Sequence, residues 1–227
     1  MKQKFTILFD LDGTLVDTAP DLMLAHNHVM KKFGYPTKST EDIRNLVGKG
    51  ASALIGRSIW GQAKKEFSRV LDEKIKDEMV KEFVNFYGKN IVNESTLVTG
   101  VKDFLIWCKE QNISMAVCTN KQEHLSNDLL KKIGIYDFFE YVAGSDTFDY
   151  CKPDPRHLTN VVEILNGDVK KTIMIGDSET DANAAKAAEI PVILLENGYT
   201  EKNTTEIYHN HLIKDYIGIE KIISKYL

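Results

Sequence analysis

The sequence predicts an α/β fold, a Rossmann-like parallel sheet with helices on both faces, interrupted by an inserted helical domain. Three observations predict it. Short apolar runs typical of buried parallel strands recur along the chain, segments with helical spacing alternate with them, and one long stretch breaks the alternation. With 227 residues, of which 43% are hydrophobic, the chain is also long enough to bury a large core.

Six apolar runs are the predicted strands. They are residues 5–9, 113–118, 141–143, 172–175, 191–195 and 211–213. Four segments between them have the spacing or the composition of helices, namely residues 102–111, 123–133, 156–165 and 181–188. Because strand and helix alternate, we expect the strands to run parallel and the helices to pack on both faces of the sheet.

The stretch from residue 17 to residue 96 does not follow this alternation. It contains helical patterns at residues 21–33, 50–59 and 73–87 and no convincing strand. Connections between a strand and a helix usually span only a few residues, so this stretch is too long to be one. We predict an α/β core of residues 1–16 and 97–227, with residues 17–96 as a helical cap domain that is free to hinge over a site.

Composition and charge argue against several functional classes. The formal net charge is −4 and the paired lysines are scattered, so no nucleic-acid-binding surface is expected. No apolar stretch approaches the ~20 residues of a membrane span, and the N-terminus lacks the layout of a signal peptide. The three cysteines have no metal-binding spacing. We expect a cytoplasmic protein without a membrane or nucleic-acid partner, and the sequence leaves open whether it is a monomer or a dimer.

The most informative motif follows the first predicted strand. Asp10 and Asp12 are two residues apart, so in a strand both side chains point to the same face. Two carboxylates at such a short distance repel each other unless a nearby cation or a shared proton relieves the repulsion. Gly13 lets the backbone turn sharply, and Thr14 adds a hydroxyl group where the chain leaves the sheet. Taken alone, the motif also fits an ordinary Asp-Gly turn on the surface.

Polar residues also follow three other predicted strands. The second strand is followed by Thr119 and Asn120, the third by Lys152, and the fourth by Asp177 and Asp181. Each of these alone also fits a helix cap, a solvated lysine or a turn. In open α/β sheets, however, the ligand crevice lies outside the carboxyl ends of the strands, so these residues are expected to meet there.

The expected site combines carboxylates, a hydroxyl group, an amide and an ammonium group. Mg²⁺ prefers oxygen ligands and suits the side chains of Asp10 and Asp177, with the backbone carbonyl of Asp12 as a third ligand. The ammonium group of Lys152 and the hydroxyl group of Thr119 suit the oxygens of a phosphate group. The sequence therefore predicts a magnesium-dependent site for a small phosphorylated substrate.

With these motifs in this order, the chain resembles the haloacid dehalogenase superfamily of phosphohydrolases over essentially its whole length, and within it the phosphoglycolate phosphatase branch. Four motifs carry the resemblance: Asp10-Leu11-Asp12-Gly13-Thr14, Thr119-Asn120, Lys152-Pro153 and Gly176-Asp177-Ser178-Glu179-Thr180-Asp181. The inserted domain is similar to the helical type of cap. Residue 189 is Glu where that branch usually carries Gly, so we expect the helix before it to end differently.

The resemblance implies a two-step phosphatase mechanism. Asp10 is the nucleophile, which forms an aspartyl-phosphate, and Asp12 is the general acid and base, which protonates the leaving group and then activates water. Thr14 is a supporting residue. Because a halide leaving group needs no proton, the presence of Asp12 argues against a dehalogenase.

The same resemblance implies the other roles in the site. Thr119, with Asn120 in support, binds phosphoryl oxygens. Lys152 offsets negative charge beside the phosphoryl group, and Asp177 anchors Mg²⁺. Asp181 either reaches the water shell of the metal or orients Lys152, and the sequence does not decide between the two.

The expected activity is Mg²⁺-dependent hydrolysis of small phosphate monoesters, with phosphoglycolate as the leading substrate. The alternatives are another phosphatase, a nucleotidase, a pyrophosphatase or a sugar-phosphate mutase on the same core, or a non-catalytic binding protein. In the cap, Lys49 stands between Gly48 and Gly50 and is predicted to meet a substrate carboxylate when the cap closes. A solvated loop lysine is the alternative interpretation of Lys49.

Overall fold

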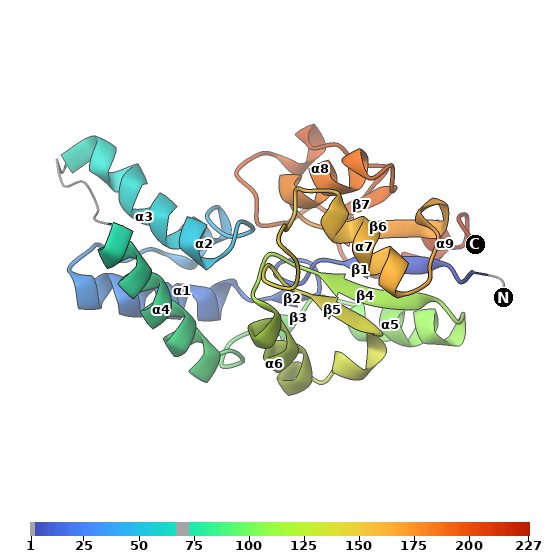
Figure 1. The fold of residues 1–227 in the computed structure, drawn as a ribbon, viewed down its shortest axis with the longest axis horizontal. Helices are drawn as coiled ribbons and strands as arrows, with labels where there is room; N and C mark the ends of the chain where they lie inside the picture. The colour runs from blue at the N-terminus through green and yellow to red at the C-terminus, as the bar shows by residue number, and fades with distance from the viewer. Residues whose placement is uncertain (1–2, 67–72) are drawn as a thin grey trace.

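A six-stranded parallel sheet forms the centre of the computed structural model, which describes residues 3–66 and 73–227 (Figure 1). The strand order is β5-β4-β1-β6-β7-β8, and every neighbouring pair is parallel. The strands are β1 (Thr6–Phe9), β4 (Ser114–Cys118), β5 (Tyr141–Ala143), β6 (Thr172–Gly176), β7 (Val192–Leu195) and β8 (His211–Ile213). All six agree with the predicted strands to within one residue at each end.

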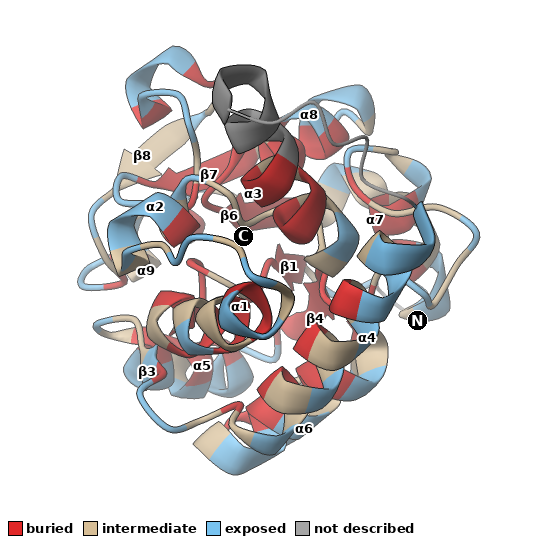
Figure 2. Ribbon diagram, turned by 90° about the vertical axis from the view of Figure 1, so that its left-hand side faces the viewer, coloured by how far each residue is buried: buried red, intermediate tan, exposed pale blue. Residues whose placement is uncertain are grey.

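Helices cover both faces of this sheet, as predicted. They are α5 (Val101–Glu110), α6 (Glu123–Ile133), α7 (Arg156–Ile164), α8 (Glu179–Ala187) and α9 (Glu220–Ile223), with three short 3-10 turns at Tyr136–Phe138, Val169–Lys171 and Thr204–Glu206. Successive residues of β1 point to opposite faces. Ile7 and Phe9 belong to a core cluster with α5, α6 and α9, whereas Leu8 belongs to a second cluster with α7 and α8. The sheet is therefore buried on both sides, and Figure 2 shows β1 and β4 as buried.

Four more helices lie together beside the sheet, at the left of Figure 1. They are α1 (Ala19–Phe33), α2 (Thr40–Arg44), α3 (Ala51–Glu66) and α4 (Glu73–Lys89). Helix α1 has Pro in its first turn and ends at Gly34, whose φ of 78° provides a left-handed cap. A capping box between Ser39 and Asp42 starts α2. Among the described residues, no helix combines the length and the apolar character needed to cross a membrane.

A short two-stranded ribbon joins the two connections between the sheet and these helices. It pairs β2 (Val16–Asp17) with β3 (Thr96–Leu97) in antiparallel register. The predicted cap began at residue 17 and ended at residue 96 without any strand, so the ribbon was not expected. Asp21 of α1 strengthens the return connection because its carboxylate accepts hydrogen bonds from the backbone N–H groups of residues 93–95. The two connections therefore lie side by side.

The end of α8 differs from the sequence expectation. Glu189 adopts a φ of 57°, in the left-handed region that favours glycine. The N–H of Ile190 donates to the Ala185 carbonyl (2.9 Å), and the N–H of Glu189 donates to that of Lys186 (3.2 Å). These two bonds form a Schellman motif, which is the usual ending with Gly at this position. The expectation that α8 ends differently is therefore wrong, because Glu189 takes the strained conformation itself.

Candidate active site

Asp10 continues the line of β1 beyond the sheet. Its backbone N–H donates to the Ile175 carbonyl (2.9 Å), which fixes the residue at the carboxyl edge between β1 and β6. The side chain is buried, with Oδ1 2.8 Å from Lys152 Nζ. Burial raises the pKa of Asp10 to about 6, although the Lys152 ammonium acts in the opposite direction. A second positive charge near Asp10 would keep this carboxylate ionised.

Lys152 is held between two carboxylates. Its Nζ lies 2.8 Å from Asp10 Oδ1 and 2.6 Å from Asp181 Oδ1. Burial disfavours the charged form, but the two carboxylates outweigh it and raise the pKa of Lys152 above its usual range. The Lys152 backbone is fixed as well, since its N–H donates to His157 Nδ1 (3.2 Å) and its carbonyl accepts from Asn120 Nδ2 (2.9 Å). The ammonium group is therefore fixed beside Asp10.

Asp181 lies in the first turn of α8 and reaches back toward the sheet. Its Oδ2 accepts hydrogen bonds from Ser178 N (3.1 Å), Ser178 Oγ (2.7 Å) and Asp177 N (3.2 Å), while Oδ1 pairs with Lys152. Of the two roles that the sequence left open, this geometry matches the orientation of Lys152.

Three buried carboxylates gather at this edge of the sheet. Oxygen atoms of Asp10, Asp177 and Asp181 lie within 4.8 Å of one another. Burial, with the neighbouring Asp181 and Asp10, raises the pKa of Asp177 well above its usual range. Asp177 is fixed by hydrogen bonds from Tyr199 N (2.6 Å) and Thr14 Oγ1 (3.2 Å). Three carboxylates beside one ammonium group leave an excess of negative charge, so the donor set fits a divalent cation with oxygen ligands.

Gly13 allows Asp177 to approach. Its φ is 80°, and a Cβ atom at this position would lie 2.2 Å from Asp177 Oδ2. No other residue type both accepts the left-handed backbone and leaves that space. The glycine that the sequence analysis assigned to a sharp turn therefore also makes room for the carboxylate cluster.

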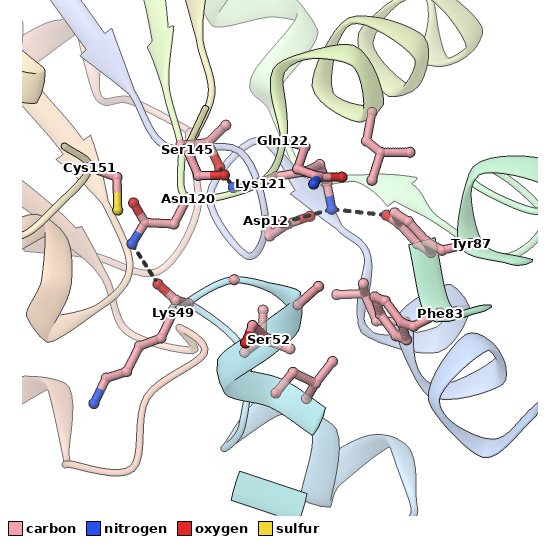
Figure 3. Close-up of a pocket in the computed structure, with 18 of the residues that line it drawn as sticks. Asp12, Lys49, Ser52, Phe83, Tyr87, Asn120, Lys121, Gln122, Ser145 and Cys151 are labelled. Carbon is pink, nitrogen blue, oxygen red and sulfur yellow. Dashed lines mark hydrogen bonds and ion pairs between the residues drawn. The ribbon is translucent and has the colours of Figure 1, made fainter. Parts of the chain in front are cut away.

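Asp12 has different surroundings from Asp10. Its Oδ1 accepts a hydrogen bond from Thr18 Oγ1 (2.6 Å), and its Oδ2 lies 2.9 Å from Lys121 Nζ. The Asp12 side chain is thus held at the wall of a cavity of about 260 Å³ between the sheet edge and the helices α1, α3 and α4 (Figure 3). The same cavity is lined by Asp10, Thr119 and Asn120. Both aspartates of the motif therefore line one cavity.

Thr119 and Asn120 lie at the end of β4, as predicted. Thr119 is buried, and its Oγ1 accepts from Lys121 N (3.2 Å). Asn120 Nδ2 donates to the carbonyls of Gly48 (3.1 Å) and Lys152 (2.9 Å), so this amide links the loop before α3 to the core.

Lys49 is the one predicted site residue whose side chain does not join this group. It is exposed, and its chain extends away from Asp12 (Figure 3). Its predicted contact with a substrate carboxylate stays a prediction.

Sequence reasoning assigned no role to Tyr199, Lys121 or Tyr87. Tyr199 follows β7; besides its N–H bond to Asp177, its hydroxyl group hydrogen-bonds Asp17 and accepts from Ala19 N (2.9 Å). Lys121 and Tyr87 meet at the cavity wall, with Nζ and Oη 3.1 Å apart. Lys121 had a signal in the sequence, because it directly follows the Thr119-Asn120 motif. The two tyrosines had none.

Comparison with known proteins identifies the family. The model for haloacid dehalogenase-like hydrolases matches residues 7–195, which contain all four motifs. The chain belongs to this family. A phosphoglycolate phosphatase of Mesorhizobium japonicum is 37% identical over 210 residues, which make up 92% of this chain and 90% of that protein. A phosphoglycolate phosphatase of Caulobacter vibrioides is 38% identical over 216 residues, with coverage of 95% and 89%.

Solved structures of the family agree with this fold. The crystal structure of a predicted phosphoglycolate phosphatase from Haemophilus somnus matches with a TM-score of 0.89 and 32% identity, and the match covers 98% of this chain and 99% of that one. A β-phosphoglucomutase from Clostridium difficile matches with a TM-score of 0.78 at 23% identity, which shows a shared fold alone. The resemblance found in the sequence is confirmed.

Proposed function

We propose that the protein is a Mg²⁺-dependent phosphatase that hydrolyses small phosphate monoesters, with 2-phosphoglycolate as its preferred substrate. The single observation that carries the proposal is the pair of carboxylates at the end of β1. Asp10 lies against Lys152 and the carboxylate cluster, whereas Asp12 lies at the wall of the same cavity 2.9 Å from Lys121. The names of the curated relatives support the choice of substrate.

Magnesium would be held by the side chains of Asp10 and Asp177 and by the backbone carbonyl of Asp12. The ion would neutralise charge on the carboxylates and on the phosphoryl oxygens. Asp181 stays with Lys152 in this assignment: its Oδ1 pairs with the ammonium group, and its Oδ2 accepts hydrogen bonds at the start of α8.

The chemistry follows from the two aspartates. A carboxylate oxygen of Asp10 attacks phosphorus, and the bond from phosphorus to the leaving oxygen breaks as Asp12 donates a proton to that oxygen. Asp12 then accepts a proton from water, whose oxygen attacks the phosphorus of the aspartyl-phosphate and releases inorganic phosphate. Thr119, with Asn120 beside it, and Lys152 bind the phosphoryl oxygens through both steps.

The helices at residues 17–96 would act as the cap. They supply the far wall of the cavity, and the paired β2 and β3 connections bring both ends of the segment to one place. Closure of such a segment excludes water from the phosphoryl group. The cavity of about 260 Å³ suits a substrate with a few carbon atoms.

The test is a phosphate-release assay with and without Mg²⁺ across 2-phosphoglycolate, sugar phosphates, nucleotides and pyrophosphate. We expect metal-dependent release from 2-phosphoglycolate at a kcat/KM orders of magnitude above the others. Equal rates across the panel would contradict the substrate assignment and indicate a generalist phosphatase. Isomerisation of a sugar phosphate without phosphate release would indicate a mutase, and no turnover of any ester would contradict the activity itself.

A further inference from the structure

The cavity contains a buried cation that the proposed phosphoryl chemistry does not use. Of the described residues that line it, Lys49 and Lys121 carry positive charge. Lys49 is exposed and directed away from Asp12, whereas Lys121 is 8% exposed and lies beside Asp12 (Figure 3). Burying an ammonium group costs free energy unless partners compensate for it. We therefore asked what Lys121 binds.

Lys121 has one hydrogen-bond donor to spare. An ammonium group carries three N–H donors. Among the described residues, the polar partners of Lys121 Nζ are Asp12 Oδ2 at 2.9 Å and Tyr87 Oη at 3.1 Å. The ring of Tyr87 also packs against the ammonium group, with its centroid 4.5 Å from Nζ. The third N–H is available to a ligand in the cavity.

Tyr87 supplies a second donor at the same place. Its hydroxyl oxygen accepts the bond from Lys121, so its own O–H points elsewhere, and the described residues offer it no acceptor. Burial, together with the negative charges of Asp12 and Asp21, raises the pKa of Tyr87 well above its usual range, so the hydroxyl group stays protonated. Lys121 and Tyr87 therefore present two adjacent donors, one of them charged, and this pattern suits an anion with two oxygens.

The cavity wall that lies opposite Lys121 and Tyr87 also offers hydrogen-bond donors and positive charge. Gly50, Ala51 and Ser52 line the cavity at the amino end of α3, whose first N–H groups have no partner within the helix. Figure 3 shows this end of α3 facing Asp12 and Lys121. The helix dipole adds a partial positive charge there. The remaining walls are largely apolar, with Leu54, Phe83 and Leu125 among them, and the side chains of Gln122 and Ser145 add polar groups.

We propose that Lys121 and Tyr87 form a carboxylate-binding subsite, which makes the enzyme selective for short phosphorylated carboxylic acids. Asp12 is the proposed acid for the leaving oxygen, and Lys121 Nζ lies next to Asp12. A carboxylate joined to the leaving oxygen through a single carbon can therefore reach Lys121 while that oxygen contacts Asp12. This assignment rests on the proposed function and names the residues that select the substrate.

The test compares two esters that differ only in charge, 2-phosphoglycolate and its amide, 2-phosphoglycolamide. The measured quantity is the ratio of their kcat/KM values, because an effect of Lys121 on Asp12 changes both esters alike. Loss of a buried ionic contact is expected to lower this ratio about 30-fold or more in Lys121→Met. Tyr87→Phe, which leaves the Lys121–Asp12 pair in place, is expected to lower it about 10-fold. Lys49→Met is the matched variant of the other cavity lysine.

The outcomes separate the two proposals. Equal losses for both esters in Lys121→Met and Tyr87→Phe would overturn the subsite, as would a fall of the ratio in Lys49→Met alone. If Lys121→Met does not fold by circular dichroism, the result for Tyr87→Phe decides. A wild-type enzyme that hydrolyses both esters equally well overturns the subsite and leaves the phosphatase activity standing. A wild-type enzyme that hydrolyses neither ester overturns the proposed function as well.

Discussion

Asp181 Oδ1 lies 2.6 Å from Lys152 Nζ, and each of these side chains is only 1% exposed. The other oxygen of Asp181 caps the first turn of α8. The position of the lysine that faces Asp10 is therefore determined by the first turn of α8, a helix that begins after the next strand, β6. A substitution of either Asp181 or Lys152 should therefore lower both the free energy of unfolding and the catalytic rate.

Replacing Lys152 by Met leaves Asp10 and Asp181 as unpaired buried carboxylates. Breaking a buried ion pair on one side typically costs about 3–5 kcal/mol, and we expect a loss of this size in the free energy of unfolding of the metal-free protein. Urea unfolding followed by circular dichroism measures it. Lys170→Met, at an exposed lysine, is the control and should change stability by less than about 0.5 kcal/mol. Equal stabilities of the two variants would show that Lys152 does not compensate the carboxylates.

Gly13 and Gly34 allow a matched pair of substitutions. Both have a φ near 80°, but a Cβ at Gly13 would lie 2.2 Å from Asp177 Oδ2, whereas a Cβ at Gly34 has no heavy atom within 4 Å. Gly34→Ala should therefore cost only the backbone strain, about 1–2 kcal/mol, and keep full activity. Gly13→Ala should in addition lose Mg²⁺ binding and phosphate release. Calorimetric titration with Mg²⁺ distinguishes the two, and wild-type Mg²⁺ affinity in Gly13→Ala would contradict the assignment of Asp177.

The strained end of α8 predicts a stabilising substitution. Glu189 adopts a φ of 57°, which costs a residue with a Cβ about 1–2 kcal/mol. Glu189→Gly relieves this strain but makes the unfolded chain more flexible, so the net gain should be about 1 kcal/mol, or roughly 2–4 °C in Tm. Glu189→Ala is the control, because it removes the carboxylate and keeps the Cβ. If both variants were stabilised equally, the charge and not the backbone would be the cause.

His157 should make the protein less stable in acid. Burial, assisted by the nearby Lys152, lowers the pKa of His157 to about 4, and the residue is fully buried against the Lys152 backbone. An unfolded chain binds a proton at this residue below about pH 6.5, so stability falls as the pH drops from there toward 4, by up to about 3 kcal/mol. Above about pH 6.5, His157 is neutral in both the folded and the unfolded chain, so it causes no further change of stability with pH.

The comparison of His157→Gln with wild type measures this effect. The free energy of unfolding of the variant should vary less between about pH 7 and pH 4.5 than that of the wild type, because one proton-linked group is gone. The exposed His124 provides the control, since His124→Gln should keep the wild-type slope. A His157→Gln variant with the same pH dependence as the wild type would contradict the argument.

Much of the fold and of the site could be predicted because the signals are local. Each strand is a short apolar run, and the polar residues of the site come directly after these runs, where a parallel sheet brings them to one edge. Asp10, Thr119, Lys152 and Asp177 were found in this way. The capping box from Ser39 to Asp42 would also have indicated α2, which was not predicted.

The contacts that could not be predicted join distant parts of the chain. The hydroxyl group of Tyr199 bonds Asp17, 182 positions earlier, and Tyr87 meets Lys121 across the cavity wall. Nothing in the neighbourhood of the two tyrosines marks them, because each lies in an ordinary helix or loop pattern. The ribbon of β2 and β3 was not predicted for a related reason, since its strands of two residues are too short to show any alternation.

The most direct test of the account is the rate of phosphate release from 2-phosphoglycolate by Asp10→Asn beside the wild type at saturating Mg²⁺. Asn keeps the size of the side chain and removes the nucleophile, so we expect the rate to fall by at least about 10⁴-fold while the protein stays folded. An Asp10→Asn variant that releases phosphate at a rate near that of the wild type would contradict covalent catalysis by Asp10.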